Sequence, residues 1–493
     1  MADDYRMLID GDWVSAGSGA VMQATSPSTG ESIGTVPEGT RADAQRAIVA
    51  AGRAWRDWAE RSAFERAAVM TRCARLVDER REDLARTLTL DQGKPLRAEA
   101  RDEVDELIRY FDMAAADATR VEGIIPPSID ASKRVLLYRV PRGVVGVISP
   151  WNWPYTMPGE ILAPALAYGN AVVWAPAPST SVCAVKLAEV LHDAGLPSGV
   201  MNMVTGPGPV VGDEIAGNSG THAVGFIGSI ATGRKVAAKA AGKELLLEMG
   251  GNGPLVILED ADIDRAVEAT LVACFLNAGQ SCTAGERVLV HGDVHDSYVE
   301  KLSASIARDV RLGDPFDDAS TMGPLNNSST IDKTERHVRD AAERGGRVVV
   351  GGRRAPELGS ELFFEATVVD GVTEDMSMAN EETFGPVVPI STIRSEEEAI
   401  SIVDRSEYGL LASVFTADLS RGLRFAERVR TGWVNVNEGT NYWESHLPFG
   451  GASGSASGVG RVGGRFSMER LTELKTIVID ISPQKPDTGP DTG

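Results

Sequence analysis

The sequence is poor in the residues that build metal centres and disulfide frameworks. Its 493 residues include six histidines and four cysteines, at positions 73, 183, 274 and 282. The cysteines form no CxxC pair and have no metal-ligand spacing with histidine, so we expect no bound metal. Four scattered cysteines in so long a chain are typical of a reducing compartment, and we therefore expect a cytoplasmic protein without disulfides.

Basic residues and long apolar runs are also scarce. Lysine and arginine together number 49 against 70 aspartates and glutamates, which gives a net charge of −21 at pH 7. Such an acidic chain is a poor candidate for binding nucleic acid. No run of about 18 apolar residues is present, so we expect no transmembrane helix and no membrane partner. The opening segment MADDYRMLIDGDW lacks the apolar stretch of a signal peptide.

Apolar strands alternate with helical segments over most of the chain, which predicts an α/β fold with parallel sheets. The length indicates two or three domains. Residues 1–40 predict short strands and turns, the pattern becomes β again from residue 133, and a second α/β unit begins near residue 255. Residues 484–493 are rich in proline, glycine and aspartate, and we expect them to be disordered.

The first third of the chain shows one hairpin signal and three helical segments. Asp10 and Gly11 in IDGDW predict the turn of a hairpin. Apolar residues recur at helical spacing in residues 42–60, 64–94 and 99–117. Gly93 is expected to end the second of these helices.

The segment GQSCTAGER places Cys282 between two hydroxyl residues, with glycines on both sides. A cysteine attacks as a thiolate and therefore needs a base or a lowered pKa. No histidine lies nearby in the sequence, so the base must be another residue type. The alternative is a buried, inert cysteine, which is the common state of a free thiol and the one we expect for Cys274.

Two polar side chains stand at strand ends in apolar surroundings, where burial is costly. Glu248 in LLLEMGGNGP ends an apolar strand and is followed by two glycines, and with a raised pKa it could serve as a general base. Asn152 in PWNWP lies in a stiff apolar loop, and its amide is a candidate donor to an oxyanion. The alternatives are a helix or turn cap for Glu248 and an Asx turn for Asn152.

Two segments are candidates for binding a nucleotide cofactor. GFIGSIATGRKV predicts a strand, then Gly228, Ser229 and Gly233, then a helix whose N-terminal N–H groups can bind phosphate. EETFGPV offers Glu382 to ribose hydroxyls and Phe384 to a flat ring. TGPGPVVG looks more like the usual dinucleotide fingerprint, but its two prolines remove N–H donors that a phosphate needs, so we reject it.

Taken in order, these segments resemble the aldehyde dehydrogenase superfamily, of the hydrolytic, NAD(P)-dependent type. The match includes LIDGDWV and SPSTGESIGTV near the start, then PWNWP, GFIGSIATG, LEMGGNGP, GQSCTAGER and EETFGPV, and finally LPFGGASGS and SGVGR. It covers nearly the whole chain. Glu248 and Cys282 are 34 positions apart, which is similar to the family's spacing of base and nucleophile.

The resemblance implies a chemistry that needs no histidine. Cys282 would attack an aldehyde carbonyl and form a thiohemiacetal, whose oxyanion is held by the Asn152 side chain and the backbone N–H of Cys282. Hydride would leave for a nicotinamide and give a thioester. Glu248 would activate the water that hydrolyses this thioester to the carboxylic acid.

The resemblance also implies three structural parts. A Rossmann-like cofactor-binding domain would comprise residues 1–122 and 142–250, and an α/β catalytic domain would comprise residues 251–470. A small β element for oligomerisation would comprise residues 123–141 and 471–483. Similar proteins form homodimers or homotetramers, so we expect a homodimer or homotetramer here.

The cofactor implied by the resemblance is NAD or NADP. Gly228 and Ser229 would hold the pyrophosphate and Glu382 the nicotinamide ribose. The other residues assigned to this site are Trp151, Gly233 and Phe384.

Family members often carry lysine and glutamate against the adenosine ribose. Ala175 and Pro178 stand at those places here, and neither side chain can bind ribose. No basic residue is supplied for a 2′-phosphate, so we expect NAD to be preferred, with NADP possible.

The expected substrate is a small aldehyde, held by two segments. YTMPGEILAPALAYG predicts a helix, and helical spacing places three residues on one face, namely Trp153, Met157 and Glu160. NEGTNYWESHLPF is expected to line the mouth of the pocket with Tyr442, Trp443, His446 and Phe449.

Glu160 bears on the choice of substrate. Relatives that take carboxylate-tailed semialdehydes often carry arginine near this position, so Glu160 predicts that carboxylate tails are repelled and that neutral, aromatic or amine-bearing aldehydes are accepted. The alternative is a structural salt bridge to a neighbouring helix. Val462 replaces the family's glutamate in the GRE stretch, which removes any proton relay through that residue.

Three other functions are considered. A CoA-acylating aldehyde dehydrogenase would pass the thioester to CoA, but such relatives usually lack the general base that Glu248 supplies. A cysteine hydrolase without redox chemistry would need a histidine partner. A non-catalytic protein on the same fold would have no need of the intact Cys282, Glu248 and Asn152 set.

Overall fold

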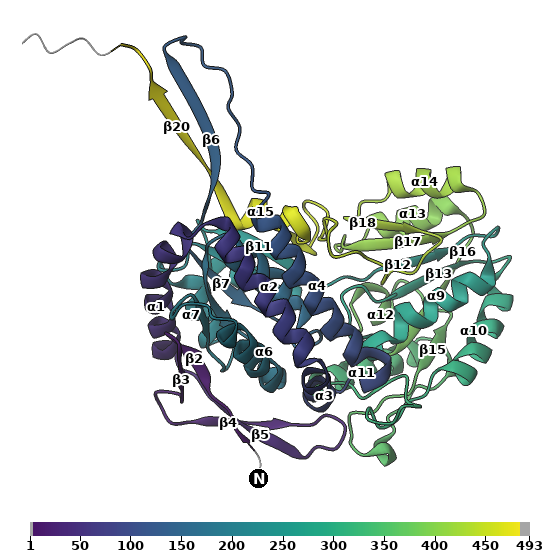
Figure 1. Cartoon of the computed structure of the whole chain (residues 1–493). Coiled ribbons are helices and arrows are strands. Elements are labelled where there is room, and N and C mark those ends of the chain that lie inside the picture. The colour runs from purple at the N-terminus through teal and green to yellow at the C-terminus, as the bar shows by residue number, and fades with distance from the viewer. Residues whose placement is uncertain (1–2, 484–493) are drawn as a thin grey trace, which may run out of the picture.

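The computed structural model describes residues 3–483, which form two α/β bodies and a two-stranded arm that projects from the first body (Figure 1). The first body contains an eight-stranded sheet and the second a seven-stranded sheet. The predicted α/β class with a small β element is therefore confirmed. Residues 484–493, which we predicted to be disordered, lie outside the described residues.

The first sheet has the strand order β19–β11–β10–β7–β8–β9–β2–β3, and its five strands from β11 to β9 run parallel. Its strands are β2 Met7–Ile9, β3 Asp12–Val14, β7 Val144–Ile148, β8 Ala171–Ala175, β9 Met201–Met203, β10 Ala223–Gly228, β11 Glu244–Met249 and β19 Gly458–Val459. A separate small sheet contains β1 Asp3–Asp4, β4 Val21–Thr25 and β5 Ser32–Pro37.

Helices cover both faces of the first sheet. They are α1 Arg41–Glu60, α2 Ala63–Glu79, α3 Arg81–Gln92, α4 Arg101–Ala118, α5 Thr156–Ala167, α6 Ser181–Asp193, α7 Val211–Gly217, α8 Ile230–Lys239 and α15 Gly464–Leu471. Val144 and Val173 pack with α1 and α7, whereas Val145 and Val172 pack into the core that contains α2 to α6. Side chains alternate along a strand, so β7 and β8 are buried on both faces.

The local sequence signals of this body are largely confirmed. Asp10 and Gly11 form the hairpin turn with φ of 58° and 85°, and Gly93 ends α3 in the left-handed conformation, with φ of 104°. The single helix predicted over 64–94 was wrong. The chain leaves helical geometry at Arg80, whose side chain binds Asp193 at the end of α6, and the break lets α3 pack against both α4 and α6.

The second sheet has the order β14–β15–β16–β13–β12–β17–β18, and all its strands except β14 run parallel. Its strands are β12 Pro254–Ile257, β13 Arg287–His291, β14 Arg347–Val350, β15 Thr367–Asp370, β16 Val387–Ile393, β17 Leu411–Phe415 and β18 Trp433–Val436. Its helices are α9 Ile263–Phe275, α10 His295–Asp309, α11 Ser328–Glu343, α12 Ser377–Asn380, α13 Glu396–Asp404 and α14 Leu419–Arg428. Separate apolar cores lie on its two faces.

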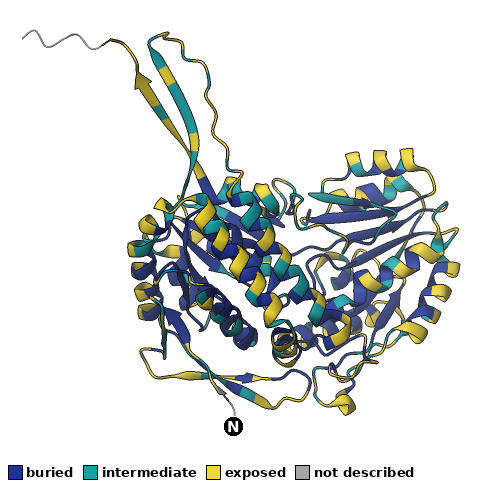
Figure 2. Ribbon diagram, in the orientation of Figure 1, coloured by how far each residue is buried: buried dark blue, intermediate teal, exposed yellow. Residues whose placement is uncertain are grey.

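The arm consists of β6 Lys133–Pro141 and β20 Thr472–Asp480, which pair antiparallel along their whole length. It stands away from both bodies and is exposed over much of its surface (Figures 1 and 2). Its exposed apolar side chains include Leu474 and Val478, each 60% exposed. Within residues 3–483, no helix is long and apolar enough to cross a membrane.

The two bodies are connected at the end of β11. The chain leaves β11 at Met249 and enters β12 of the second sheet at Pro254. It returns at β19, which pairs antiparallel with β11 opposite Leu247 and Glu248. The loops at the carboxyl ends of β7, β10 and β11 therefore face loops of the second body, and this is the edge of an α/β sheet where ligands bind.

Candidate active site

Cys282 lies where two cavities between the bodies meet. One cavity, of 240 Å³, extends toward the start of α8 and is called the α8 cavity. The other, of 40 Å³, extends along α5 and is called the α5 cavity. Cys282 and Met157 line both of them. A group bound in one cavity can therefore approach a group bound in the other at the Cys282 thiol.

The Glu248 carboxyl lies next to this thiol at the end of β11. Burial raises the pKa of Glu248 to about 8, and interaction with Cys282 partly opposes that rise. Burial, followed by the nearby Glu248 carboxyl, raises the pKa of the Cys282 thiol well above its usual range. The Oε1 atom of Glu248 has no hydrogen-bond partner within the described residues, so it is free to accept a proton. The pair thus contains a nucleophile and a base without histidine.

Asn152 lies in the loop between β7 and α5 and also lines the α8 cavity. The Asn152 Nδ2 atom donates to the backbone carbonyl of Gln280 at 3.0 Å. The backbone carbonyl of Asn152 accepts from Asn277 Nδ2 at 2.8 Å. These bonds fasten the Asn152 loop to the loop that carries Cys282. The side-chain amide is therefore held beside the thiol rather than free to rotate.

The Cys282 loop has a strained start. Asn277, Ala278 and Gly279 have successive positive φ of 52°, 53° and 73°, which is costly for the two residues that are not glycine. Glu99 compensates by accepting from Asn277 N at 3.0 Å, and Gln92 donates to Asn277 Oδ1 at 2.9 Å. These anchors were missed in the sequence. The signal that could have indicated these anchors was a set of isolated polar residues close to the glycines of DQGKP and NAGQS.

Lys94 forms a second anchor, beneath the wall of the α5 cavity. Its buried Nζ lies 2.5 Å from Glu103 Oε2 and 3.2 Å from the centre of the Trp153 ring. The other carboxyl oxygen of Glu103 accepts from Tyr155 N at 2.9 Å and from Thr156 N at 3.3 Å, where α5 begins. One buried ion pair therefore positions both Trp153 and the start of α5.

Five of the six predicted cofactor residues line the α8 cavity together with Cys282 and Glu248, namely Trp151, Gly228, Ser229, Glu382 and Phe384. Gly233, the sixth, does not line this cavity. It is buried inside α8, where an added Cβ would lie 2.1 Å from Met249 Sδ, so its small size serves the packing of α8 on β11.

The α8 cavity fits a dinucleotide. The α8 helix begins at the cavity, with Ser229 as its N-cap accepting from Thr232 N, so its first-turn N–H groups are available to phosphate. Glu382 is turned toward the glycines after β11 and accepts from Gly251 N at 3.1 Å. The rings of Trp151 and Phe384 pack edge to face at 5.5 Å. The site thus offers phosphate donors, a carboxylate for hydroxyls and aromatic walls.

Five of the seven predicted substrate residues line the α5 cavity, namely Trp153, Met157, Glu160, Trp443 and Phe449. Tyr442 and His446, which we expected at the mouth of the pocket, are exposed and are not among the lining residues, whereas Trp443 between them is turned toward the cavity. The Tyr442 hydroxyl instead donates to Glu444 at 2.8 Å.

Two carboxyl groups line the α5 cavity, Glu106 from α4 and Glu160 from α5. Glu160 forms no salt bridge within the described residues, so the structural ion pair that we considered is absent there, and its polar contact is with the Tyr110 hydroxyl at 3.4 Å. Burial and the neighbouring Glu248 raise the pKa of Glu160 well above its usual range, and burial raises that of Glu106 to about 7. No lysine or arginine belongs to the described lining.

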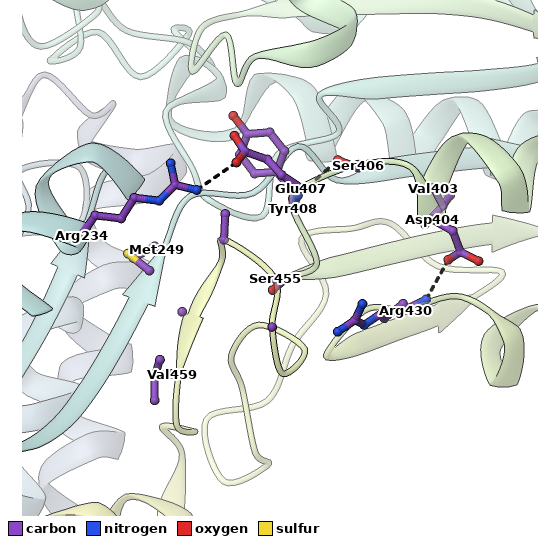
Figure 3. A pocket seen from close by; sticks show the side chains of 13 residues that line it. Arg234, Met249, Val403, Asp404, Ser406, Glu407, Tyr408, Arg430, Ser455 and Val459 are labelled. Atoms are coloured by element: carbon purple, nitrogen blue, oxygen red, sulfur yellow. Dashed lines mark hydrogen bonds and ion pairs between the residues drawn. The ribbon is translucent and has the colours of Figure 1, made fainter.

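A third cavity, of 310 Å³, is lined by residues of both bodies, among them Arg234 and Glu407 (Figure 3). The ion pair of Arg234 with Glu407, at 3.0 Å, joins the two bodies across it. Tyr408, another lining residue, accepts a hydrogen bond from Glu382 N at 3.2 Å. This cavity contains no cysteine among its described lining residues and is separate from the Cys282 centre.

Comparisons with known proteins match almost the whole chain. The 3-sulfolactaldehyde dehydrogenase of Pseudomonas putida is 38% identical over 476 residues, which is 96% of each chain. The NADP-dependent succinate-semialdehyde dehydrogenase of Escherichia coli K12 is 38% identical over 478 residues, covering 97% of this chain and 98% of that protein.

A solved structure is similar as well. The betaine aldehyde dehydrogenase of Staphylococcus aureus, a point mutant in complex with NAD+ and with a BME-modified cysteine, has a TM-score of 0.93 and 33% identity, covering 98% of this chain and 97% of that one. The sequence model described as the aldehyde dehydrogenase family matches residues 13–477. The chain belongs to the aldehyde dehydrogenase family.

Proposed function

We propose that the protein oxidises an aldehyde to the carboxylic acid with NAD(P)+. The observation that carries this proposal is the position of the Cys282 thiol, which lies beside Glu248 and Asn152 at the junction of the α8 and α5 cavities. The α8 cavity has the donors that a dinucleotide needs, and the α5 cavity is walled by aromatic side chains. Membership of the aldehyde dehydrogenase family supports the same reaction.

In the first half of the reaction, ionised Glu248 accepts the thiol proton of Cys282. The thiolate attacks the carbonyl carbon of an aldehyde in the α5 cavity and forms a thiohemiacetal. The Asn152 amide, held in place by its bond to Gln280, donates to the developing oxyanion together with the backbone N–H of Cys282. A nicotinamide bound in the α8 cavity supplies the hydride acceptor, and Cys282 is left as a thioester.

In the second half, Glu248 first releases the thiol proton to solvent and then removes a proton from the water that attacks the thioester. The carboxylic acid leaves and the Cys282 thiol is restored. The presence of Glu248 therefore favours hydrolysis over transfer of the acyl group to CoA. Turnover that depends on CoA would support the CoA-acylating alternative instead. A cysteine hydrolase without redox chemistry would act without NAD(P)+, and the absorbance of reduced nicotinamide separates the two.

Replacing Cys282 with serine tests the nucleophile. Cys282→Ser should abolish aldehyde oxidation and leave NAD+ binding intact, because a hydroxyl is a far weaker nucleophile than a thiolate. Cys274→Ser is the matched control. Its thiol is buried and bonded to the Gly285 carbonyl at 3.2 Å, so this variant should keep most of its turnover. Near-normal turnover by Cys282→Ser would remove Cys282 from the mechanism.

Replacing Glu248 with glutamine tests the general base. Glu248→Gln should slow thioester hydrolysis on the order of 10²- to 10⁴-fold, so a burst of reduced cofactor should precede a slow steady state. The wild-type rate of hydrolysis should rise with pH through about 8, where the Glu248 carboxyl ionises, and this rise should be lost in the variant. An unchanged steady-state rate with the same pH profile would contradict the assignment.

For the cofactor we infer a preference for NAD with tolerance of NADP. Ala175 ends β8 and Pro178 begins the next turn, and neither side chain can bind ribose or hold a 2′-phosphate. Pro178 also has no carboxylate to repel that phosphate. The remaining cofactor contacts are assigned to Trp151, Gly228, Ser229, Glu382 and Phe384.

For the substrate we infer that a carboxylate tail is disfavoured. Glu106 and Glu160 both line the α5 cavity, and its described lining includes no basic side chain to neutralise an anionic tail. Burial and the nearby Glu248 raise the pKa of Glu160, which favours its protonated form, so a carboxylate tail is disfavoured mainly because no cation is present to bind it. An amine-bearing aldehyde would instead favour ionisation of these carboxyl groups.

A panel of aldehydes assayed with NAD+ and with NADP+ tests both inferences. Succinate semialdehyde should rank below a neutral aldehyde of similar length in kcat/KM, and NAD+ should be the better cofactor. Glu160→Arg should reduce or reverse the difference in kcat/KM between the two aldehydes. The isosteric Glu160→Gln should leave that difference unchanged. A wild-type preference for the carboxylate-tailed aldehyde would refute the inference for Glu160.

A preference for NADP+ over NAD+ above about tenfold in kcat/KM, or roughly 1.4 kcal/mol, would reveal a phosphate site.

We infer that the arm is an oligomerisation element. Residues 123–141 and 471–483 expose apolar side chains that a second copy of the chain would cover, among them Ile125 and Leu474. The remaining described residues are assigned to the cofactor-binding domain, up to residue 250, and to the catalytic domain, from 251 to 470. Within that second range, β19 pairs with β11 and α15 packs on α5, so these two elements belong to the first body. The free cysteines are compatible with a reducing, cytoplasmic location, which cell fractionation tests.

Light scattering tests the role of the arm. The wild type should be a homodimer or homotetramer. Replacing Leu474 and Val478 with lysine should produce smaller species, because burying the added charges at an interface is costly. Exchanging Val459 for lysine, an exposed valine outside the arm, is the control and should not change the mass. A monomeric wild type would contradict the inference.

A further inference from the structure

One buried carboxylate of the Cys282 loop has no role in the reaction described above. Glu286 lies four positions after Cys282, immediately before β13, and is 3% exposed. Its two oxygens accept from consecutive backbone N–H groups of another loop, Oε2 from Thr383 at 2.8 Å and Oε1 from Phe384 at 2.7 Å. The loop that carries the thiol is thereby bonded to the loop that carries Glu382 and Phe384.

The segment held by Glu286 is strained. Phe384 has φ of 59°, a conformation that bulky residues rarely adopt. Its ring nevertheless faces the α8 cavity, and the preceding Glu382 bonds to Gly251 N at the end of β11. The two N–H groups of Thr383 and Phe384 point in one direction, as needed for both to reach a single carboxylate. A backbone that orients two donors in this way is stabilised when an anion accepts both.

The surroundings act on the charge of Glu286 in two opposing ways. Burial raises the pKa of Glu286 to about 7, whereas the two backbone N–H bonds and the cation of Lys333 on α11 lower it. Lys333 also lies 5.9 Å from the centre of the Phe384 ring. The N–H bonds and Lys333 thus stabilise the ionised form of Glu286.

We propose that Glu286 is a positioning residue that holds Glu382 and Phe384 in the conformation that completes the dinucleotide site. The inference rests on the proposed function, because it assigns the α8 cavity to NAD(P)+. Glu286 itself does not line that cavity. Its effect on the cofactor would pass through Phe384 and Glu382, and through the fixed distance between their loop and the thiol loop.

Glu286→Gln tests the proposal, because the variant keeps the size of the side chain but presents an NH2 group to one of the two backbone donors. The dissociation constant and the KM for NAD+ should rise on the order of tenfold, with a smaller change in kcat for saturating cofactor. Without any cofactor, amide hydrogen exchange in the peptide that contains residues 381–387 should become faster, while exchange in the core strands stays slow.

Asp260→Asn is the matched control. Asp260 also accepts from two consecutive backbone N–H groups, of Ala417 and Asp418, but lines neither the α8 nor the α5 cavity. This variant should leave NAD+ affinity unchanged.

If Glu286→Gln does not fold, Glu286→Asp keeps the charge but is too short to span both donors, and it should show the same faster exchange. In a Phe384→Gly background, where positive φ has no steric cost, Glu286→Gln should weaken NAD+ binding much less than in the wild type.

The outcomes separate this proposal from the proposed function. A wild type that does not bind NAD+ would overturn both. A wild type that binds and uses NAD+, with a Glu286→Gln variant of equal affinity and unchanged exchange at 381–387, would overturn the role of Glu286 alone. Weakened binding of NAD+ together with faster local exchange is the result that supports it.

Discussion

The contact between the Cys282 thiol and the Glu248 carboxyl is the interaction on which the rest of the site depends. Both groups are buried, and burial raises the pKa of each. Neither is reactive in that state at neutral pH, since the thiol is protonated and the carboxyl ionises only near pH 8. Glu248 must accept a proton first from the Cys282 thiol and later from water. Both transfers require that the two side chains stay adjacent while ligands occupy the cavities on either side.

Keeping them adjacent is a problem of loop geometry. Glu248 belongs to the first sheet, whereas Cys282 lies in a loop of the second body with three successive positive φ values. Positive φ in a residue other than glycine costs about 1–3 kcal/mol, so such a loop persists only when its surroundings hold it. Glu99 gives that support directly by accepting from Asn277 N. Glu103 and Glu286 hold the neighbouring segments instead, by accepting backbone N–H groups at the start of α5 and at Thr383 and Phe384.

The same buried carboxylates explain part of the acidic character of the site. A carboxylate that accepts backbone N–H bonds is stabilised in place, and Lys94 is the fully buried cation that offsets this charge at Glu103. Burying these carboxylates costs desolvation free energy. Each of them fixes a backbone conformation in return, as expected for a site that must be preorganised. Glu106 and Glu160 differ, because they face the α5 cavity, where a substrate can change their ionisation.

Much of the fold and part of the site could be predicted from the sequence. Strand and helix periodicity gave the α/β class, and local motifs identified Cys282, Glu248 and Asn152, whose surroundings in the sequence are distinctive. Other features depend on contacts between distant segments. The helix that periodicity extends is broken at Arg80, where the side chain binds Asp193, and Gly233 packs against Met249 rather than lining a cavity.

Positions within a loop were also beyond sequence reasoning. NEGTNYWESHLPF contains four candidate side chains, but only Trp443 and Phe449 line the α5 cavity, and Tyr442 and His446 are exposed. Anchors such as Gln92, Glu99 and Glu286 were missed for a related reason. Each acts on a loop far away in the sequence, and nothing in its neighbours indicates that partner.

The central claim is that the acyl group of the aldehyde becomes bonded to the Cys282 sulfur during oxidation. The most direct measurement is peptide mass mapping of the Glu248→Gln protein after it is mixed with an aldehyde and NAD+ and quenched in acid. We expect the acyl group to replace the thiol hydrogen in the peptide that contains Cys282, and to be absent when NAD+ is omitted. An acyl group on another cysteine, or none while reduced cofactor is formed, would contradict the account.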